Sequence, residues 1–312
     1  MTTAGRLALY AAGLAMAFLG AYGIAAAVVP GDMVTNRTEG TTMEDHGSRP
    51  ELPTGALSGL SLSAHGYALS PVTAPVQVGE PGELSFSIID EDGNALVAFE
   101  TSHEKALHLI VVRSDGAEYR HVHPVLDATT GRWSIPWEWN EAGTYRVYAD
   151  FAPSAPGDRG AATLSRTVHV AGELEPVHVD AVATTDEVDG FQVSVDGRLI
   201  AGAAGELTVT VRRNGEPVTE LQPYLGAFGH LVALRDGDLA YLHVHAHGDE
   251  PREGETSGPE ITFSAEAPTA GRYLLYLDFQ VDGQVHTARF VLDAAPGHGG
   301  SDPHGRHGSG DH

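Results

Sequence analysis

The sequence predicts an all-β protein in which two tandem immunoglobulin-like or cupredoxin-like β-sandwich domains follow an N-terminal transmembrane helix. First, the chain repeats itself at an offset of about 122 residues, which is the length of a whole domain. Second, apolar side chains alternate with polar ones at a period of two, as in Leu84, Phe86 and Ile88. Third, Gly, Pro and Asp-Gly signals recur roughly every 8–12 residues, a spacing typical of short antiparallel strands.

Residues 1–30 are predicted to form a single-pass membrane anchor. The stretch from Leu7 to Pro30 carries no charge and is mostly apolar, and it is longer than the roughly 20 residues that cross a bilayer. Arg6 precedes it and favours an N-terminus inside the cell, with the bulk of the chain outside the cell membrane. The alternative is a signal peptide cleaved after the Ala25–Ala27 run, which would remove residues 1–27 and give a secreted protein.

Two segments lack the apolar residues that a core requires. Residues 31–55 have few large apolar side chains and no periodicity, so we expect a flexible tether. Residues 295–312 are rich in glycine and are predicted to form a disordered tail. The histidines of this tail could collect metal ions, or the tail could simply be solvated. They are His298, His304, His307 and His312.

Matching motifs place the first sandwich at residues 56–173 and the second at residues 174–294. A strand that starts at His108 matches a strand that starts at His230, and each ends in Arg after four apolar residues. A His-Val-His motif follows at residues 121–123 in the first copy and at residues 243–245 in the second. Because both copies keep the same step from the first histidine to this motif, the grouping is not accidental.

Each pair of matching segments is predicted to form a hairpin. Asp-Gly lies between the two apolar runs, at residues 115–116 and at residues 236–237, and Asp-Gly is a strong turn signal. Folding at these turns places His108 opposite His123, and His230 opposite His243. Opposite residues, and residues two apart on a strand, point to the same side of a sheet. We therefore expect the three histidines of each copy to share one face.

Three imidazoles on one rigid face suit a divalent metal, so we expect a Cu(II) site, or less readily a Zn(II) site, in each domain. The chain has no Cys, and its 4 Met all lie within the first 43 residues, which excludes sulfur ligands in the folded part. Asp127 and Asp150 could supply a fourth ligand or orient a histidine, or could be solvated; Asp249 and Asp278 are their counterparts. The candidate ligands are His108, His121, His123, His230, His243 and His245.

The composition excludes several classes of function. Asp and Glu outnumber Lys and Arg by 42 to 18, giving a net charge of -24, so we expect no nucleic-acid partner. Without Cys, a disulfide scaffold, an iron–sulfur cluster and a thiol nucleophile are excluded. The sequence also lacks a G-x-S-x-G elbow, a P-loop and a dinucleotide fingerprint, so we expect a non-enzymatic protein. The enzymatic alternative is a metal-dependent enzyme with a three-His site of the cupin or carbonic-anhydrase type.

The hairpin motifs resemble those of exported bacterial YtkA-like proteins. The resemblance rests on residues 108–116 followed by His121-Val-His123-Pro124. The run 221–230 is similar to the second half of two-domain, membrane-anchored proteins of high-GC Gram-positive bacteria. This resemblance implies a copper-handling β-sandwich and extracytoplasmic heavy-metal binding by the six histidines. The second copy departs from the pattern, because Ala246 stands in place of the proline, which puts the equality of the two sites in doubt.

We therefore expect a membrane-anchored, extracytoplasmic protein that binds, buffers or delivers copper. The expected partners are the metal ion and a copper transporter or another metal-handling protein of the cell surface. The alternative is a membrane-tethered adhesion or assembly scaffold, without metal, whose repeated hairpins pack the two domains together. Trp133, Trp137 and Trp139 are expected to pack in the core, with a ligand-stacking role as the alternative.

Overall fold

A computed structural model describes residues 58–154, 160–179, 181–242, 244–252 and 254–297. These residues form strands, turns and bends without an α-helix, which confirms the all-β class. Within this part of the chain, no helix is long and apolar enough to cross a membrane. The predicted anchor and tether, and the tail from residue 298, lie outside the described residues. All of the described residues fall within one compact unit.

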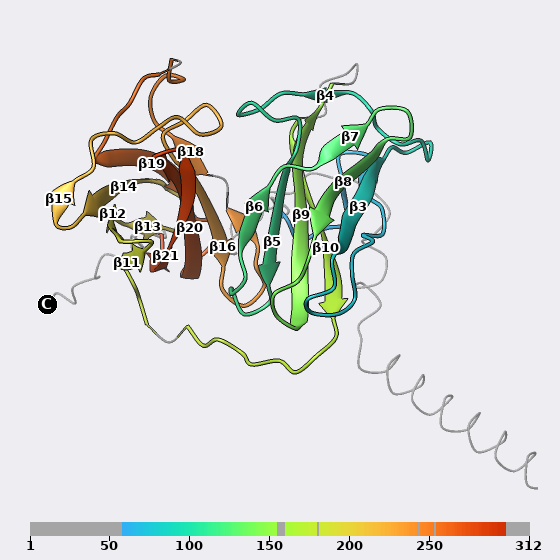
Figure 1. The fold of residues 1–312 in the computed structure, drawn as a ribbon, viewed down its shortest axis with the longest axis horizontal. Coiled ribbons are helices and arrows are strands. Elements are labelled where there is room, and N and C mark those ends of the chain that lie inside the picture. Colours follow the sequence, from blue (N-terminus) through green and yellow to red (C-terminus); the bar gives the residue numbers. More distant parts are fainter. Residues whose placement is uncertain (1–57, 155–159, 180, 243, 253, 298–312) are drawn as a thin grey trace, which may run out of the picture. The chain divides into compact units, whose positions relative to one another are not determined.

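The first sandwich consists of two antiparallel sheets (Figure 1). One sheet has the strand order β1-β2-β3-β8-β7, and the other has the order β10-β9-β5-β6, with β4 paired to β9. The strands are β1 (Ser63–Ala64), β2 (Tyr67–Leu69), β3 (Gly82–Ile89), β4 (Phe99–Glu100), β5 (His108–Arg113), β6 (Arg120–Val122), β7 (Val125–Asp127), β8 (Arg132–Trp137), β9 (Gly143–Pro153) and β10 (Ala162–Val170).

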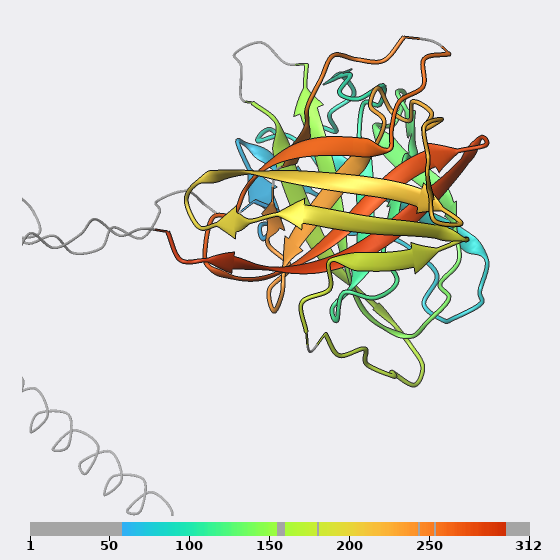
Figure 2. The same cartoon turned by 90° about the vertical axis from the view of Figure 1, so that its left-hand side faces the viewer.

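The second sandwich repeats this plan. One sheet has the order β11-β12-β14-β19-β18, with β15 paired to β14, and the other has the order β13-β21-β20-β16-β17. Figure 2 shows β12, β14 and β19, coloured from yellow to orange, side by side. The strands are β11 (Thr185–Val188), β12 (Phe191–Gly197), β13 (Leu199–Ile200), β14 (Ala204–Arg213), β15 (Glu216–Pro217), β16 (His230–Arg235), β17 (Tyr241–Leu242), β18 (Val244–Ala246), β19 (Glu260–Glu266), β20 (Gly271–Val281) and β21 (Gln284–Ala295).

Each sandwich has its own core, built from the side chains that alternate along the strands. In the first domain, Leu84, Phe86 and Ile88 of β3 point inward together with Leu109 and Val111 of β5. The three tryptophans at positions 133, 137 and 139 belong to the same core and are at most 5% exposed, so the packing role predicted for them is confirmed. This alternation buries one face of each sheet and stabilises the sandwich through the hydrophobic effect.

A third apolar cluster lies between the two domains. All six residues of β5 are buried, because Leu109 and Val111 face the domain's own core while Ile110 and Val112 face the second domain. On β16, Val232 and Leu234 likewise belong to this third cluster. The continuous apolar runs of both repeats therefore have two buried faces, which explains why these strands do not alternate with polar residues.

Tyrosines from both domains complete the junction in a matched way. The Tyr148 hydroxyl donates to the Leu239 carbonyl at 2.6 Å, and the Tyr276 hydroxyl donates to the Gly116 carbonyl, also at 2.6 Å. Each donor lies on a central strand of one domain, and each acceptor lies in the hairpin turn of the other. Tyr119 stacks on Tyr276 with ring centroids 4.1 Å apart. The repeated hairpins thus do pack the two domains together.

Candidate metal site at the domain junction

The first hairpin brings the three histidines of the first domain together. Leu109 pairs with Val122 and Ile110 pairs with His121, so the same register sets His108 opposite His123. This is the register that the sequence predicts. Because opposite residues point to the same side, His108 and His121 share the side of Ile110, which faces the second domain.

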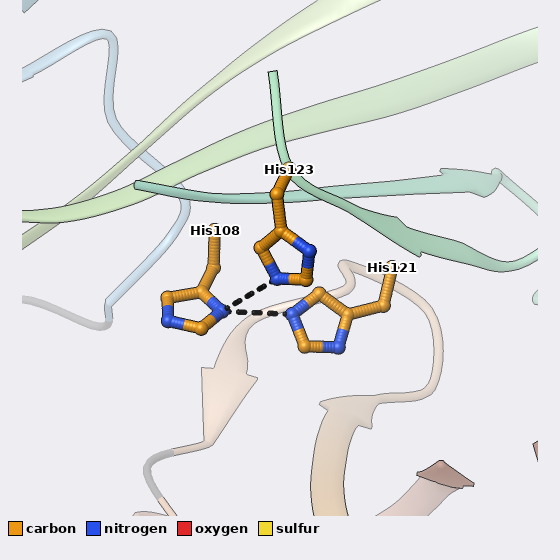
Figure 3. Close-up of side chains that lie close together, drawn as sticks. All are labelled: His108, His121 and His123. Atoms are coloured by element: carbon orange, nitrogen blue, oxygen red, sulfur yellow. Dashed lines mark hydrogen bonds between the residues drawn. The ribbon is translucent and has the colours of Figure 1, made fainter. Parts of the chain in front are cut away.

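The three rings converge on one another (Figure 3). Nδ1 of His108 lies 3.0 Å from Nε2 of His121 and 3.2 Å from Nε2 of His123. One ring nitrogen of each histidine lies within 4.8 Å of those of the other two. His108 is 8% exposed, the side chain of His121 is 4% exposed, and His123 is half-buried. The result is a nitrogen-rich group that is largely shielded from water.

Hydrogen bonds on the outer side of two rings fix which nitrogens carry lone pairs. His108 donates from Nε2 to the Ser102 carbonyl at 3.0 Å, and His121 donates from Nδ1 to Oδ2 of Asp278 at 2.9 Å. Carbonyl and carboxylate oxygens only accept hydrogen bonds, so these two nitrogens must carry the protons. In neutral rings, the lone pairs of His108 Nδ1 and His121 Nε2 then face each other. A cation between them, either a metal ion or a proton, makes this arrangement favourable.

The spacing of the nitrogens suits a tetrahedral metal. Metal–nitrogen bonds of 2.0–2.1 Å place two ligand nitrogens about 3.3 Å apart in a tetrahedral site. The two separations that involve His108 Nδ1, 3.0 and 3.2 Å, need only a small expansion to reach this value. A histidine whose outer N–H is held by a carboxylate or a carbonyl is the usual form of a metal ligand.

The surroundings keep two of the rings, those of His108 and His123, neutral. Burial, followed by the nearby His121, lowers the pKa of His108 to about 4. Burial and the same neighbour lower the pKa of His123 to about 3. Neutral imidazole is the form that binds metals, so these two ligands need no deprotonation at neutral pH.

The second domain takes part in the site through Asp278. This aspartate lies on β20, is 3% exposed, and accepts a second hydrogen bond from Thr287 Oγ1 to its Oδ1 at 2.6 Å. Both carboxylate oxygens are therefore held, one by its own domain and one by His121 of the first domain. Sequence reasoning treated Asp278 as a candidate for the site of its own domain, and the structure instead assigns it to the site of the other domain.

The second copy does not form an equivalent hairpin face. Ala233 pairs with Leu242 and Leu234 pairs with Tyr241, a register that differs by two residues from the predicted pairing of His230 with His243. His245 lies on β18, where it pairs with Ser264 of β19 in the other sheet from His230. The prediction of one shared face is therefore wrong for this copy.

The residue after each His-Val-His motif explains this difference. Pro124 has no backbone N–H and ends the pairing of the first motif, whereas Ala246 pairs with Phe263 in a regular ladder. The first copy crosses to the other sheet at β7, after Pro124, whereas the second copy crosses at β18, whose first residue, Val244, already lies within the motif. His243 itself lies outside the described residues.

The other aspartates that the sequence proposed have different surroundings. Asp127 caps its own turn, accepting from the Thr129 amide at 2.9 Å and from Thr130 Oγ1 at 2.8 Å, on the exposed surface. Asp150 pairs with His108 across β9 and β5 and accepts from Thr163 Oγ1 at 2.8 Å. Asp249 lines a surface groove of the second domain.

Sequence reasoning missed His103, which has no histidine counterpart in the second copy. Its ring lies 6.2 Å from that of His108 and 5.1 Å from that of His230, measured between centroids. Together with Lys105 and His121, these three histidines line a cavity of about 200 Å³ between the domains. No sequence pattern marks His103, because the turn that carries it reaches the site only once the two domains pack.

A family profile described as "Domain of unknown function (DUF8832)" matches residues 63–171 and again residues 186–296. The chain belongs to the DUF8832 family. One DUF8832 domain corresponds to each β-sandwich, and the three converging histidines belong to the first. No curated protein matches the sequence.

Several solved structures are similar to parts of this chain. A DUF4426 family protein from Pseudomonas aeruginosa PAO1 shares 11% identity with a TM-score of 0.26, over 36% of this chain and 96% of that one. The adhesin InvE of Yersinia pseudotuberculosis shares 13% identity with a TM-score of 0.21, over 75% of this chain and 60% of that one. Invasin, a bacterial integrin-binding protein, shares 16% identity with a TM-score of 0.21, over 73% and 38% of the two chains.

Proposed function

We propose that the first domain of this protein binds a divalent metal ion, Cu(II) or less readily Zn(II), through His108, His121 and His123. One observation carries the proposal. His108 Nδ1 and His121 Nε2 face each other, and hydrogen bonds to Ser102 and Asp278 place the ring protons on the opposite nitrogens, which leaves a lone pair on each of the two facing atoms. A nitrogen-only ligand set favours Cu(II) over the other divalent ions in affinity. No other group of three or more metal-binding side chains was found among the described residues.

Binding, buffering or delivery of copper outside the cell is the role that we propose for this site. The YtkA-like resemblance and the predicted N-terminal anchor support that location, and a copper transporter or another metal-handling surface protein is the proposed partner. The net charge of -24 would raise the local concentration of cations near the site. The half-buried His123 leaves one side of the group accessible to an incoming ion.

Metal titration of purified residues 55–312 tests the proposal. The wild type should bind Cu(II) in competition with a chelator, and His121→Ala should weaken the tightest site at least tenfold while the protein stays folded. His169→Ala is the matched control, because His169 is an exposed histidine of the same domain, on β10. The tail histidines are present in all three proteins and cancel in the comparison. Equal affinity of the wild type and His121→Ala would contradict the proposal.

A second candidate function is an adhesion or assembly scaffold without a metal. The observation that favours it is the third apolar cluster, which packs the two domains against each other. In that case the histidines would stabilise only the junction. His121→Ala would then lower the free energy of unfolding to the same extent with and without Cu(II), whereas the metal-binding function predicts that Cu(II) stabilises the wild type far more than the variant.

A further inference from the structure

We propose that His103 and His230 form a second metal position, which bridges the two domains and faces solvent beside the three-His group. This inference rests on the proposed function, because it places a second ion next to the first. Its ligand class is the same divalent ion, held by two imidazole nitrogens and by carboxylate or water oxygens. We infer that this position is the weaker of the two and the more rapidly exchanging.

The geometry of the two rings supports a shared ion. The centroids of His103 and His230 lie 5.1 Å apart with the ring planes at 82°. Within the three-His group, the corresponding separations are 4.9 to 5.2 Å. The two rings from different domains are therefore spaced like the rings that already converge on one point.

A tight turn holds His103 in this place. His103 and Glu104 both have a positive φ, of 49° and 63°, and Ser102 and Lys105 exchange backbone hydrogen bonds around them. Such left-handed residues are uncommon outside glycine and are retained only when the surroundings fix them. The turn projects the exposed His103 toward the second domain, and the same turn supplies the Ser102 carbonyl that orients His108.

His230 is prepared for ligation in the same way as His108. Its Nε2 donates to the Tyr224 carbonyl at 2.8 Å and to the Leu225 carbonyl at 3.1 Å, which leaves Nδ1 with the lone pair in the neutral ring. Burial, followed by the nearby His121, lowers the pKa of His230 to about 3, so the ring is neutral at physiological pH. Its centroid lies 6.4 Å from that of His108 and 6.2 Å from that of His121, too far for His230 to belong to the first group.

The surroundings of His103 offer oxygen ligands and access from solvent. His103 lines both the junction cavity and a second groove of about 360 Å³, whose lining includes His247, Asp249 and Glu250. Glu250 and His103 both approach Gly226. Glu250 Oε1 and the Cα of His103 each lie 4.0 Å from the point that a Cβ on Gly226 would occupy. The groove that His103 shares with Asp249 and Glu250 thus brings carboxylate side chains to the solvent side of the His103 turn.

The test compares Cu(II) binding by residues 55–312 in the wild type, His103→Ala, His123→Ala and the control His169→Ala. Calorimetry with a competing chelator gives the stoichiometry and the affinity of each class of site. We expect His103→Ala to bind one equivalent less Cu(II) than the wild type and the control, with the affinity of the tightest site changed less than threefold. We expect His123→Ala to weaken the tightest site and to keep the weaker one.

Electron paramagnetic resonance of the fully loaded wild type should show spin–spin coupling between two nearby ions, and His103→Ala should abolish it.

The outcomes separate this inference from the proposed function. If His103→Ala binds as many ions as the wild type and keeps the coupling, the second position is wrong, while a loss of tight binding in His123→Ala still supports the first site. If the wild type binds no Cu(II), the proposed function fails and the second position fails with it.

Discussion

At the scale of single residues, the groups that accept hydrogen bonds from the histidines set which ring nitrogens are free to bind a metal. Ser102 and Asp278 decide which nitrogen of His108 and of His121 carries a proton, and thereby create two facing lone pairs. The grouping of the three histidines of the first domain could be predicted from the sequence, because His-Val-His after an apolar strand is a local pattern. Asp278 could not be assigned to His121, because they lie 157 residues apart and meet only across the packed domains.

Asp278→Asn tests the role of this aspartate. The amide keeps the shape of the side chain but removes the charge that holds the His121 N–H, so the ring can rotate or change tautomer. We expect Cu(II) affinity to fall about 10- to 100-fold, the usual effect of losing a group that orients a metal-bound histidine. Chelator competition measures this change, and Asp127→Asn, at an exposed turn, serves as the control. Unchanged affinity in Asp278→Asn would show that His121 needs no such partner.

The lowered pKa values of three buried histidines predict that the metal-free protein loses stability in mild acid. Since folding depresses the pKa of His108, His123 and His230 below the ordinary value of about 6.5, the unfolded chain binds more protons than the folded one below that pH. This stability is complete above about pH 6.5 and is lost as the pH falls toward the folded-state values of about 3 to 4.

Urea unfolding at pH 7.5 and at pH 5.5, with a chelator present, measures this effect. We expect the free energy of unfolding to fall by about 1 kcal/mol for each of the three histidines. His123→Gln should reduce the difference between the two pH values, and His169→Ala should leave it unchanged. Equal stability at both pH values would contradict the neutral state of the rings.

At the scale of elements, the two hairpins show that matching sequence motifs do not guarantee the same strand register. The register of β5 with β6 follows from the sequence, whereas the register of β16 with β17 differs by two residues from the predicted one. The dipeptide Asp-Gly locates a turn but not its length, and both turns here are longer than two residues. A proline follows the first motif but not the second, and this is a further reason why two segments that look alike in sequence pair differently with their neighbours.

The matched tyrosine hydrogen bonds give a prediction at this scale. Tyr276→Phe and Tyr148→Phe each remove one hydroxyl that satisfies a carbonyl in the hairpin turn of the other domain. We expect each variant to lower the free energy of unfolding by about 1–3 kcal/mol, because a buried carbonyl loses its partner. Chemical denaturation measures both. A loss in only one of them would show that the two halves of the junction are not equivalent in energy.

At the scale of the whole molecule, the tandem sandwiches could be predicted, but their packing against each other could not be derived in detail. Alternation and turn signals define each sandwich, since they depend on neighbours along the chain. The junction depends on Ile110, Val112, Val232 and Leu234, which look like ordinary core residues of a buried strand. A continuous apolar run shows that both faces of a strand are covered without showing what covers the second face.

Packing across this junction predicts that the two domains unfold together. Calorimetry of residues 55–312 should give a single transition, because separating the domains would expose the third apolar cluster to water. Leu234→Asp places an unpaired charge in that cluster and should split the transition in two or lower its midpoint by at least about 5 °C. Two well-separated transitions in the wild type would contradict this packing.

Anomalous X-ray diffraction from crystals soaked with Zn(II) or Cu(II) tests the central claim most directly, because it locates the ion. The strongest anomalous peak should lie about 2.0–2.1 Å from His108 Nδ1, His121 Nε2 and a ring nitrogen of His123. Asp278 should still accept the His121 N–H in that structure. A strongest peak elsewhere in the protein, with no density among these three rings, would contradict the claim that this hairpin is a metal site.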